Sequence, residues 1–260
     1  MRKIVSIILA AMMMTACGGG SASDGTGLTF TMVKAGKTVS ISQEQGAPQC
    51  QVSLQLAAVK DGEQAAVINK AIISQLLNIE DMSDMQQAAD SFAAKYTRDY
   101  QRNFAQLYRE DRNDAAKRAW YEYHYNITTE TKGGREGISV YTAIIDYYEG
   151  GAHGINQKLI MNFDNKTGKL LTLSDIFVAG FEQNLNSLLL EKLMVKADVD
   201  NIDKLHEKGY LYSMDMFAPE NFSIDEESIT FVYNPYEIAP YDKGMIELTL
   251  DYDELKEIWK

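Results

Sequence analysis

The chain is poor in the two residue types that most often build disulfide frameworks and metal sites. It contains two cysteines and three histidines in 260 residues. Two cysteines are too few for the disulfide scaffold of a small secreted domain. His124, His153 and His206 are far apart in the sequence, and none has a second His or a Cys at metal-ligand spacing. We therefore expect no metal site and no cofactor.

Positive charge is also scarce, with 25 Lys and Arg residues against 37 Asp and Glu residues and a formal net charge of −12. Such a charge disfavours contact with nucleic acid and with anionic lipid headgroups. We therefore expect no nucleic-acid partner. Two interpretations of the acidic surface stay open: it attracts cationic proteins through its long-range field, or it keeps the chain soluble.

No hydrophobic run is long enough for a permanent transmembrane helix. The apolar run at residues 4–14 follows a basic pair at residues 2–3, and it is shorter than the ~20 residues that a spanning helix needs. Small residues then lead into Cys17. This order predicts a bacterial lipoprotein signal peptide over residues 1–16, with acyl chains such as palmitate on Cys17. An ordinary secretory signal followed by a chance cysteine is the alternative.

The residues after that signal predict a tether and a location. Residues 17–27 are rich in Gly and Ser, which is typical of a flexible linker. We expect the protein in the cell envelope, in contact with a membrane through the lipid anchor; which membrane stays open. Cys50 then has no intramolecular partner. It lies in an alternating apolar pattern at 49–59, which predicts a buried, unreactive thiol.

The hydrophobic pattern predicts an α+β fold with antiparallel sheets. Residues 28–164 are expected to form an N-terminal module with two long helices, at 64–79 and at 84–110 after a cap at Asp84. Residues 165–260 are expected to form a C-terminal module with one or two helices. No linker separates the modules, so we expect them to pack as one body. The predicted strands are 28–33 and 37–42 with a turn at Ala35-Gly36, then 49–59, 118–131, 138–148, 155–163, 228–233 and 245–252.

Three finer predictions concern side chains on these elements. Asn162 alternates with apolar residues on its strand and is expected to face solvent. Ser174 is expected to cap a short helix. The second helix carries aromatic residues mostly four apart, a spacing that indicates packing against a core rather than a ligand box. The members of this stripe are Phe92, Tyr96, Tyr100 and Phe104.

A glycine-rich turn at 150–154 (GGAHG) is the first candidate site. Gly150 and Gly151 would let a ligand approach the backbone closely. His153, with Asp146, Glu149 and Asp164 nearby in the sequence, could act as a general base oriented by a carboxylate. The alternative is that the glycines supply positive φ angles and that His153 caps the turn or packs. Since no nucleophile is apparent, we name no catalytic residue.

The second candidate site is the loop 233–241, YNPYEIAPY. Tyr236 and Tyr241 are framed by Pro235 and Pro240, and exposed aromatic faces suit sugar stacking or a protein hot spot. The alternative is a rigid closing loop whose tyrosines cover the core. Either X-Pro bond could be cis, and the sequence leaves this open.

Three motifs together resemble a known family: the turn at 150–154, the run TGKLLTLSDIF at 167–177, and the loop at 233–241. They are similar to the extracellular region of the anti-sigma factor RsiV family, whose modules also occur beside the catalytic domain of the peptidoglycan deacetylase PdaC. The resemblance implies an α+β fold and, from RsiV, lysozyme binding. It does not imply deacetylase activity, because the His-x-x-x-His pair of that enzyme class is missing. We expect a lipid anchor in place of the RsiV transmembrane helix.

These observations favour a non-catalytic lipoprotein of the cell envelope that binds a lysozyme-like cationic protein or a peptidoglycan fragment. The candidate ligand-binding residues are Gly150, Gly151, His153, Tyr236 and Tyr241. Two alternatives stay open: a hydrolase of envelope glycan or peptide that uses His153, and a structural or assembly lipoprotein without a small ligand.

Overall fold

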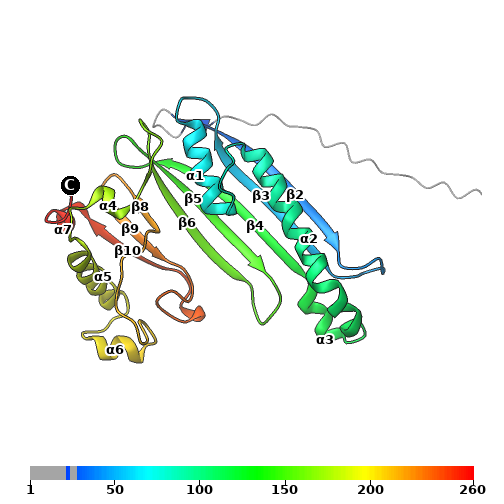
Figure 1. The fold of residues 1–260 in the computed structure, drawn as a ribbon. Coiled ribbons are helices and arrows are strands. Elements are labelled where there is room, and N and C mark those ends of the chain that lie inside the picture. Colours follow the sequence, from blue (N-terminus) through cyan, green and yellow to red (C-terminus); the bar gives the residue numbers. More distant parts are fainter. Residues whose placement is uncertain (1–21, 24–27) are drawn as a thin grey trace, which may run out of the picture.

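The computed structural model describes residues 22–23 and 28–260 (Figure 1). Cys17, the predicted signal peptide and most of the predicted tether lie outside the described residues. Within the segment predicted as a tether, β1 (Ala22–Ser23) pairs antiparallel with β2. The described chain forms a seven-stranded sheet and a three-stranded sheet with helices. None of its helices is both long and apolar enough to cross a membrane.

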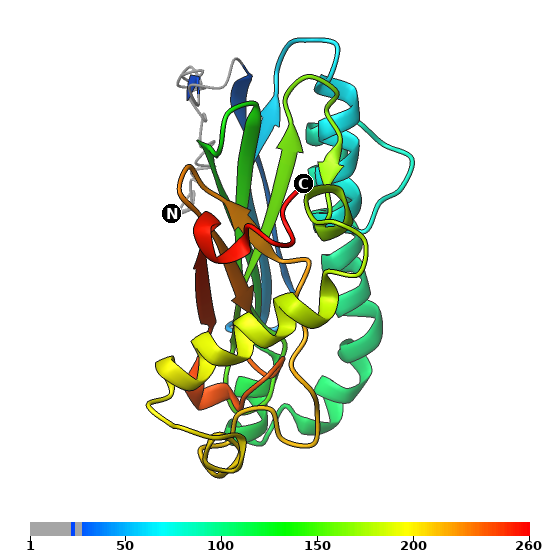
Figure 2. The same cartoon turned by 90° about the vertical axis from the view of Figure 1, so that its left-hand side faces the viewer.

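The seven-stranded sheet has its strands in sequence order. All neighbouring strands are antiparallel except β3 and β4, which are parallel. A parallel pair needs a long crossover, which α1 and α2 supply on one face of the sheet (Figures 1 and 2). The elements are β2 (Thr29–Ser40), β3 (Gln49–Val59), α1 (Ala65–Leu77), α2 (Met85–Asp111), α3 (Ala115–Arg118), η1 (Ala119–Tyr121), β4 (Tyr123–Gly133), β5 (Ile138–Tyr148), β6 (Ile155–Asp164) and β7 (Leu170–Leu171).

The predicted turn at Ala35-Gly36 was wrong, because β2 runs straight through it. Ala35 pairs with Leu54 and Gly36 pairs with Ser53, in register with the rest of the β2–β3 ladder. A Cβ atom at Gly36 would lie 3.2 Å from the carbonyl oxygen of Val52. The glycine therefore fits a close approach between two paired strands rather than a turn.

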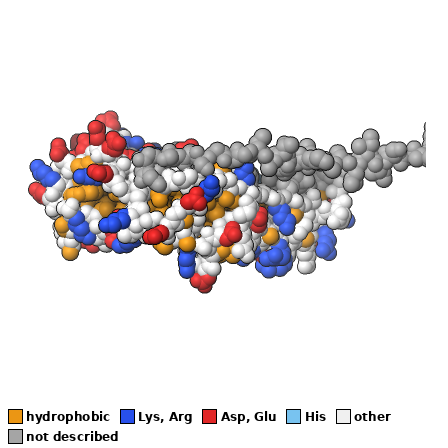
Figure 3. All heavy atoms as spheres, turned by 90° about the horizontal axis from the view of Figure 1, so that it is seen from above, with side chains coloured by type: hydrophobic (Ala, Val, Ile, Leu, Met, Phe, Trp, Pro, Cys, Tyr) orange, Lys and Arg blue, Asp and Glu red, His pale blue; other side chains and the backbone are white. Residues whose placement is uncertain are grey.

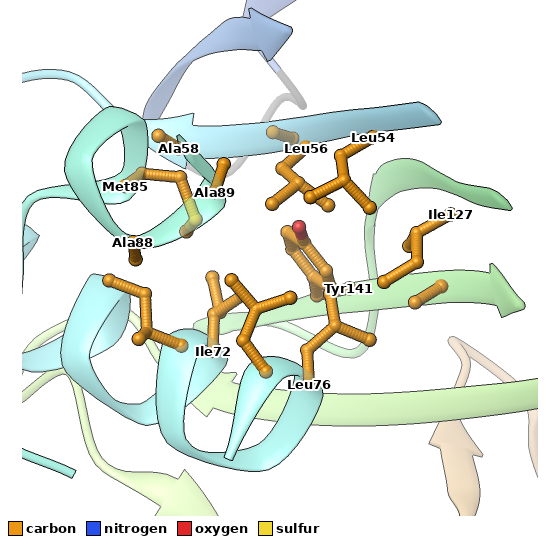
Figure 4. Close-up of a cluster of buried hydrophobic side chains, with 14 of the residues drawn as sticks. Leu54, Leu56, Ala58, Ile72, Leu76, Met85, Ala88, Ala89, Ile127 and Tyr141 are labelled. Carbon is orange, nitrogen blue, oxygen red and sulfur yellow. The ribbon is translucent and has the colours of Figure 1, made fainter. Parts of the chain in front are cut away.

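The larger core lies between the helices and the seven-stranded sheet (Figure 4). Asp84 caps α2 as predicted, since its side chain accepts a hydrogen bond from the Gln87 amide at 3.0 Å. Cys50 is fully buried and free, and burial raises the pKa of its thiol to about 12, which makes it unreactive as expected. The side chains labelled in Figure 4 include Leu54, Leu56, Ile72, Leu76, Met85, Ile127 and Tyr141.

A second core lies under the three-stranded sheet, whose order is β10-β9-β8. Leu185, Leu189 and Leu193 of α5 are fully buried in it. Thr172, not Ser174, caps α4, in a capping box with Asp175. The strand β8 was not predicted. The elements are α4 (Leu173–Ile176), α5 (Glu182–Lys196), α6 (Ile202–Glu207), β8 (Phe222–Ile224), β9 (Ser228–Tyr233), η2 (Tyr241–Lys243), β10 (Ile246–Asp251) and α7 (Tyr252–Leu255).

Side-chain amides join the two sheets. Asn162 is 1% exposed rather than facing solvent: its Nδ2 donates to the carbonyl oxygen of Phe222 at 2.7 Å and its Oδ1 accepts from the amide of Ile224 at 3.0 Å. Asn221 similarly accepts from the amide of Ile160 at 2.8 Å. These bonds dock the second sheet on the face of β6 that points away from α1 and α2. The α+β fold class is thus confirmed, with one parallel strand pair that the pattern did not predict.

Candidate functional site

The turn at 150–154 requires glycine at its first position. Gly150 has φ +83°, and a Cβ atom there would lie 2.8 Å from the carbonyl oxygen of Trp120. Gly151 has φ +103°, and its carbonyl oxygen accepts a hydrogen bond from Tyr148 Oη at 2.9 Å. Both angles lie where L side chains are strained. The turn therefore folds tightly back toward η1 and the start of β4, and it presents His153 at the surface.

The loop after β9 is held by one of its own side chains and by β6. The amide of Asn234 donates to Glu237 Oε2 at 2.9 Å, and Asn234 Oδ1 accepts from the Lys158 amide at 2.7 Å. Tyr236 adopts φ +75°, an unusual angle for a residue with a side chain, and is 58% exposed. The described residues contain no cis peptide bond, so both prolines of the loop are trans.

The structure brings together three of the predicted residues, His153, Tyr236 and Tyr241, which we call the tip cluster. The His153 and Tyr241 rings stack with their centroids 3.8 Å apart and an angle of 14° between the ring planes. Tyr236 Oη lies 3.2 Å from His153 Nε2, and Tyr241 Oη donates to the carbonyl oxygen of Gly154 at 2.9 Å. Gly150 and Gly151 shape the turn that carries His153. Two segments more than 80 residues apart therefore form one surface.

The polar contacts of His153 suit recognition better than base catalysis. Its Nδ1 lies 3.2 Å from the carbonyl oxygen of Gly154, and its Nε2 faces the hydroxyl of Tyr236. A carbonyl oxygen only accepts, so Nδ1 carries a proton, and in the neutral ring Nε2 then accepts from Tyr236. Neither partner is the carboxylate that orients a general base. The predicted partner Asp146 instead lies 3.2 Å from His124 Nε2, on β4.

A polar cleft of about 440 Å³ lies between the two sheets. Two ion pairs join its walls: Lys132 Nζ to Asp225 and Lys158 Nζ to Glu247, each at 2.5 Å. Thr142 and Ser223 are among its other lining residues. The face of the molecule seen in Figure 3 likewise carries acidic side chains next to basic ones. Within the described residues, no group of His, Cys, Asp and Glu side chains is arranged to hold a metal ion.

One family model matches part of the chain, "Protein of unknown function (DUF3298)", over residues 174–253. The chain contains a DUF3298 domain. The matched residues include α5, β8, β9, β10 and the loop that carries Tyr236 and Tyr241.

The DUF3298 match agrees with similarities to a curated protein and to two solved structures. Peptidoglycan-N-acetylmuramic acid deacetylase PdaC of Bacillus subtilis is 26% identical over 179 residues, which cover 68% of this chain and 36% of PdaC. This chain therefore spans about a third of the length of that relative. A crystal structure of a DUF3298 family member from Bacteroides fragilis is 26% identical, with a TM-score of 0.81 over 92% of this chain and 96% of that one. A DUF3298 family protein from Pseudomonas aeruginosa has the same fold, with 18% identity and a TM-score of 0.59 over 90% of this chain and 94% of that one.

These similarities confirm one part of the resemblance predicted from the sequence and leave the other part untested. Similarity to PdaC is confirmed, whereas membership of the RsiV family and the lipid anchor stay predictions. Sequence analysis also missed one group of side chains. The aromatic stripe of α2 was interpreted as packing only, although Tyr96 of that stripe donates a hydrogen bond to Glu149, which directly follows Tyr148, the last residue of β5. The sequence feature that could have indicated this contact is the acidic residue Glu149, which lies between the end of a predicted strand and the glycine-rich turn.

Proposed function

We propose that this protein is a non-catalytic lipoprotein of the bacterial cell envelope that binds a cationic, lysozyme-like protein through the tip cluster. The observation that carries the proposal is the meeting of the turn at 150–154 with the loop at 233–241. These are two of the three motifs that resemble the RsiV extracellular region, and they form one exposed aromatic surface. Exposed tyrosines are frequent anchors at protein interfaces.

Charge and relatedness support the same proposal. The net charge of −12 favours encounter with a cationic partner. Glu237 and Asp242 flank Tyr236 and Tyr241 in the sequence and are exposed. The similarity to PdaC, a protein named for its action on peptidoglycan, supports a place in the envelope. A peptidoglycan fragment is the second candidate ligand, because the exposed Tyr236 ring could also stack on a sugar.

The test is direct binding of the chain from residue 18 onward to lysozyme and, separately, to soluble muropeptides, at low and high salt. Saturable lysozyme binding that survives high salt, and that weakens in Tyr236→Ala and His153→Ala, supports the proposal. Binding that disappears with salt reduces it to non-specific attraction between opposite charges. Binding of muropeptides alone moves the function to glycan recognition. Binding of neither leaves the assembly role, to be pursued by partner capture from cells.

The lipid anchor needs its own experiment. We expect labelled palmitate to be incorporated into the full-length chain in a bacterial host and to be lost in Cys17→Ala. Membrane fractionation of the same two proteins gives an independent readout. A Cys17→Ala protein that stays membrane-bound would contradict the anchor.

A further inference from the structure

A groove of about 380 Å³ runs along α2, on the helix-covered side of the seven-stranded sheet. Its walls include five aromatic rings, of which only that of Tyr100 is fully buried. Neighbouring rings lie between 5.1 and 6.0 Å apart, centroid to centroid. The groove therefore presents half-buried ring surfaces to an incoming group. The five are Phe92, Tyr96, Tyr100, Phe104 and Tyr123.

Glu149 places a carboxylate among these rings. Its Oε1 accepts a hydrogen bond from Tyr96 Oη at 2.6 Å. Its negative charge adds to burial in raising the pKa of the hydroxyls of Tyr96, Tyr123 and Tyr147. The carboxylate is therefore close to rings from α2, β4 and β5 at once. It is also exposed and can accept further hydrogen bonds.

The charge of the groove is set by Glu149. Three charged residues line it: Lys95, Asp99 and Glu149. Lys95 Nζ lies 3.0 Å from a carboxylate oxygen of Asp99, so the charges of these two residues cancel. Asp99 also contacts Arg102 at 3.1 Å. The lining residues by themselves thus sum to one negative charge, which Glu149 holds against aromatic faces, while Arg102 lies outside the lining and is paired with Asp99.

We propose that this groove binds the cationic side chain of a lysine or arginine from a protein partner, with Glu149 as its counter-ion. Ring faces attract cations through their quadrupole, and a carboxylate at the same place adds a charge-assisted hydrogen bond. The groove lies next to the tip cluster along the chain, because Glu149 directly precedes Gly150. The proposal therefore rests on the proposed function, and it assigns a second contact point for the same cationic partner.

The test uses two small probes that differ in one charge. Nα-acetyl-arginine methylamide carries a guanidinium, and its citrulline counterpart carries a neutral group of nearly the same shape. We titrate each into the chain from residue 18 onward at physiological salt and follow chemical shifts of the tyrosine rings. The expected result is saturable binding of the arginine probe alone, and about a tenfold loss of affinity in Glu149→Gln, which corresponds to about 1.4 kcal/mol.

Matched variants distinguish the effect of the charge on binding from the effect of the aromatic ring and from a loss of folding. Glu226→Gln removes the same charge from an exposed turn and should leave binding unchanged. Phe92→Leu keeps an apolar side chain but removes a ring, and should weaken binding about threefold, as expected for a partly exposed cation–π contact. Thermal unfolding checks that each variant is folded. The comparison of the two probes on the unaltered protein does not depend on any variant.

Some outcomes overturn the inference. Equal binding of the arginine and citrulline probes, or unchanged arginine binding in Glu149→Gln, would remove the role of the carboxylate. Binding of a chitooligosaccharide in the groove, with no arginine binding, would assign it to glycan instead. The proposed function fails separately: if lysozyme does not bind while the arginine probe does, the groove stands and the tip cluster does not.

Discussion

The tip cluster and the Glu149 groove are both aromatic surfaces, but they are held in place differently. The tip cluster comes from a turn and a loop whose backbone angles include φ +83°, +103° and +75°. The rings of the groove project from α2 and β4, and they pack partly on the larger core and partly on a separate buried cluster that contains Cys50, Tyr100 and Tyr108. The first surface therefore depends on the docking of two sheets, whereas the second lies on the seven-stranded sheet and its own helices. This difference makes the groove the more pre-organised of the two.

The largest expected effect comes from Asn162→Ala, which should loosen the docking of the two sheets on which the tip cluster depends. It leaves the carbonyl group of Phe222 and the amide of Ile224 without their partner in a buried place, which costs about 2–4 kcal/mol of unfolding free energy. Urea denaturation measures the loss. Asn156→Ala, on the exposed part of the same strand, is the control and should stay within about 0.5 kcal/mol of the original protein.

The same variant should affect the two surfaces unequally. Loosening of the second sheet should separate His153 from Tyr236 and Tyr241, while the groove keeps its arginine probe. The ring stacking of His153 can be followed through its imidazole chemical shifts. Equal losses at both surfaces would show that the groove depends on the docking of the sheets as much as the tip cluster does, and an unchanged tip cluster would show that it does not depend on the docking.

Gly150→Ala should destabilise more than Gly151→Ala. Both residues have positive φ angles, and a non-glycine residue in such a conformation costs about 1–3 kcal/mol. At Gly150 the new methyl group would also meet the carbonyl oxygen of Trp120, whereas at Gly151 it meets nothing within 4 Å. The difference between the two unfolding free energies isolates the clash from the backbone strain. A larger loss at Gly151 would contradict the described path of the turn.

A pH above 10 should destabilise the folded protein through the ionisation of Tyr123, a tyrosine of the groove. Burial, with the charge of Glu149 as a smaller cause, raises the pKa of Tyr123 to about 12, above its value of about 10 in unfolded chains. The folded state therefore favours the protonated phenol, so this stability is present below pH 10 and is lost between pH 10 and 12. Denaturation at a series of pH values and ultraviolet absorbance of phenolate measure it. In Glu149→Gln the absorbance change should move to lower pH, and in Glu226→Gln it should not.

Tyr236→Gly should have the smallest effect on stability and still weaken the tip cluster. Glycine adopts φ +75° without strain, which offsets the lost ring contacts. Tyr236→Ala loses the same contacts and keeps the strain, so we expect it to be less stable than Tyr236→Gly by about 1 kcal/mol. Thermal unfolding of the pair gives the difference. The opposite order would indicate that the conformational entropy of glycine in the unfolded chain outweighs the relief of backbone strain at this position.

Sequence reasoning predicted elements where the pattern is local and strong. The bounds of β3 and β5 and the Asp84 cap of α2 follow from alternation, periodicity and capping chemistry. The predictions were wrong where one residue type suits two structural roles. Gly36 is both a turn former and a strand residue at a close approach, and Asn162 is polar but buried because its amide pairs with another strand.

The candidate sites show the same limit. His153, Tyr236 and Tyr241 were singled out because each lies in a distinctive motif, and the structure brings them together. The groove could not be found in this way. Tyr96 and Glu149 are 53 residues apart, and the helical spacing of the aromatic stripe is equally consistent with simple packing. The end of β5 that carries Glu149 is placed beside α2 by the parallel pairing of β3 with β4, which the sequence pattern did not predict.

That parallel pairing also has a consequence for the order in which the chain folds. The hairpin of β2 and β3 is local, but the free edge of β3 gains its partner only after the whole segment 60–122 has been synthesised and the two helices have crossed. Until then β3 exposes unpaired backbone groups to other chains, and a long closure slows the step that protects them. The edge of β3 at the centre of the sheet therefore stays open to aggregation until β4 has been synthesised and paired with it. We expect the pairing of β3 with β4 to be the folding step most sensitive to chaperone supply.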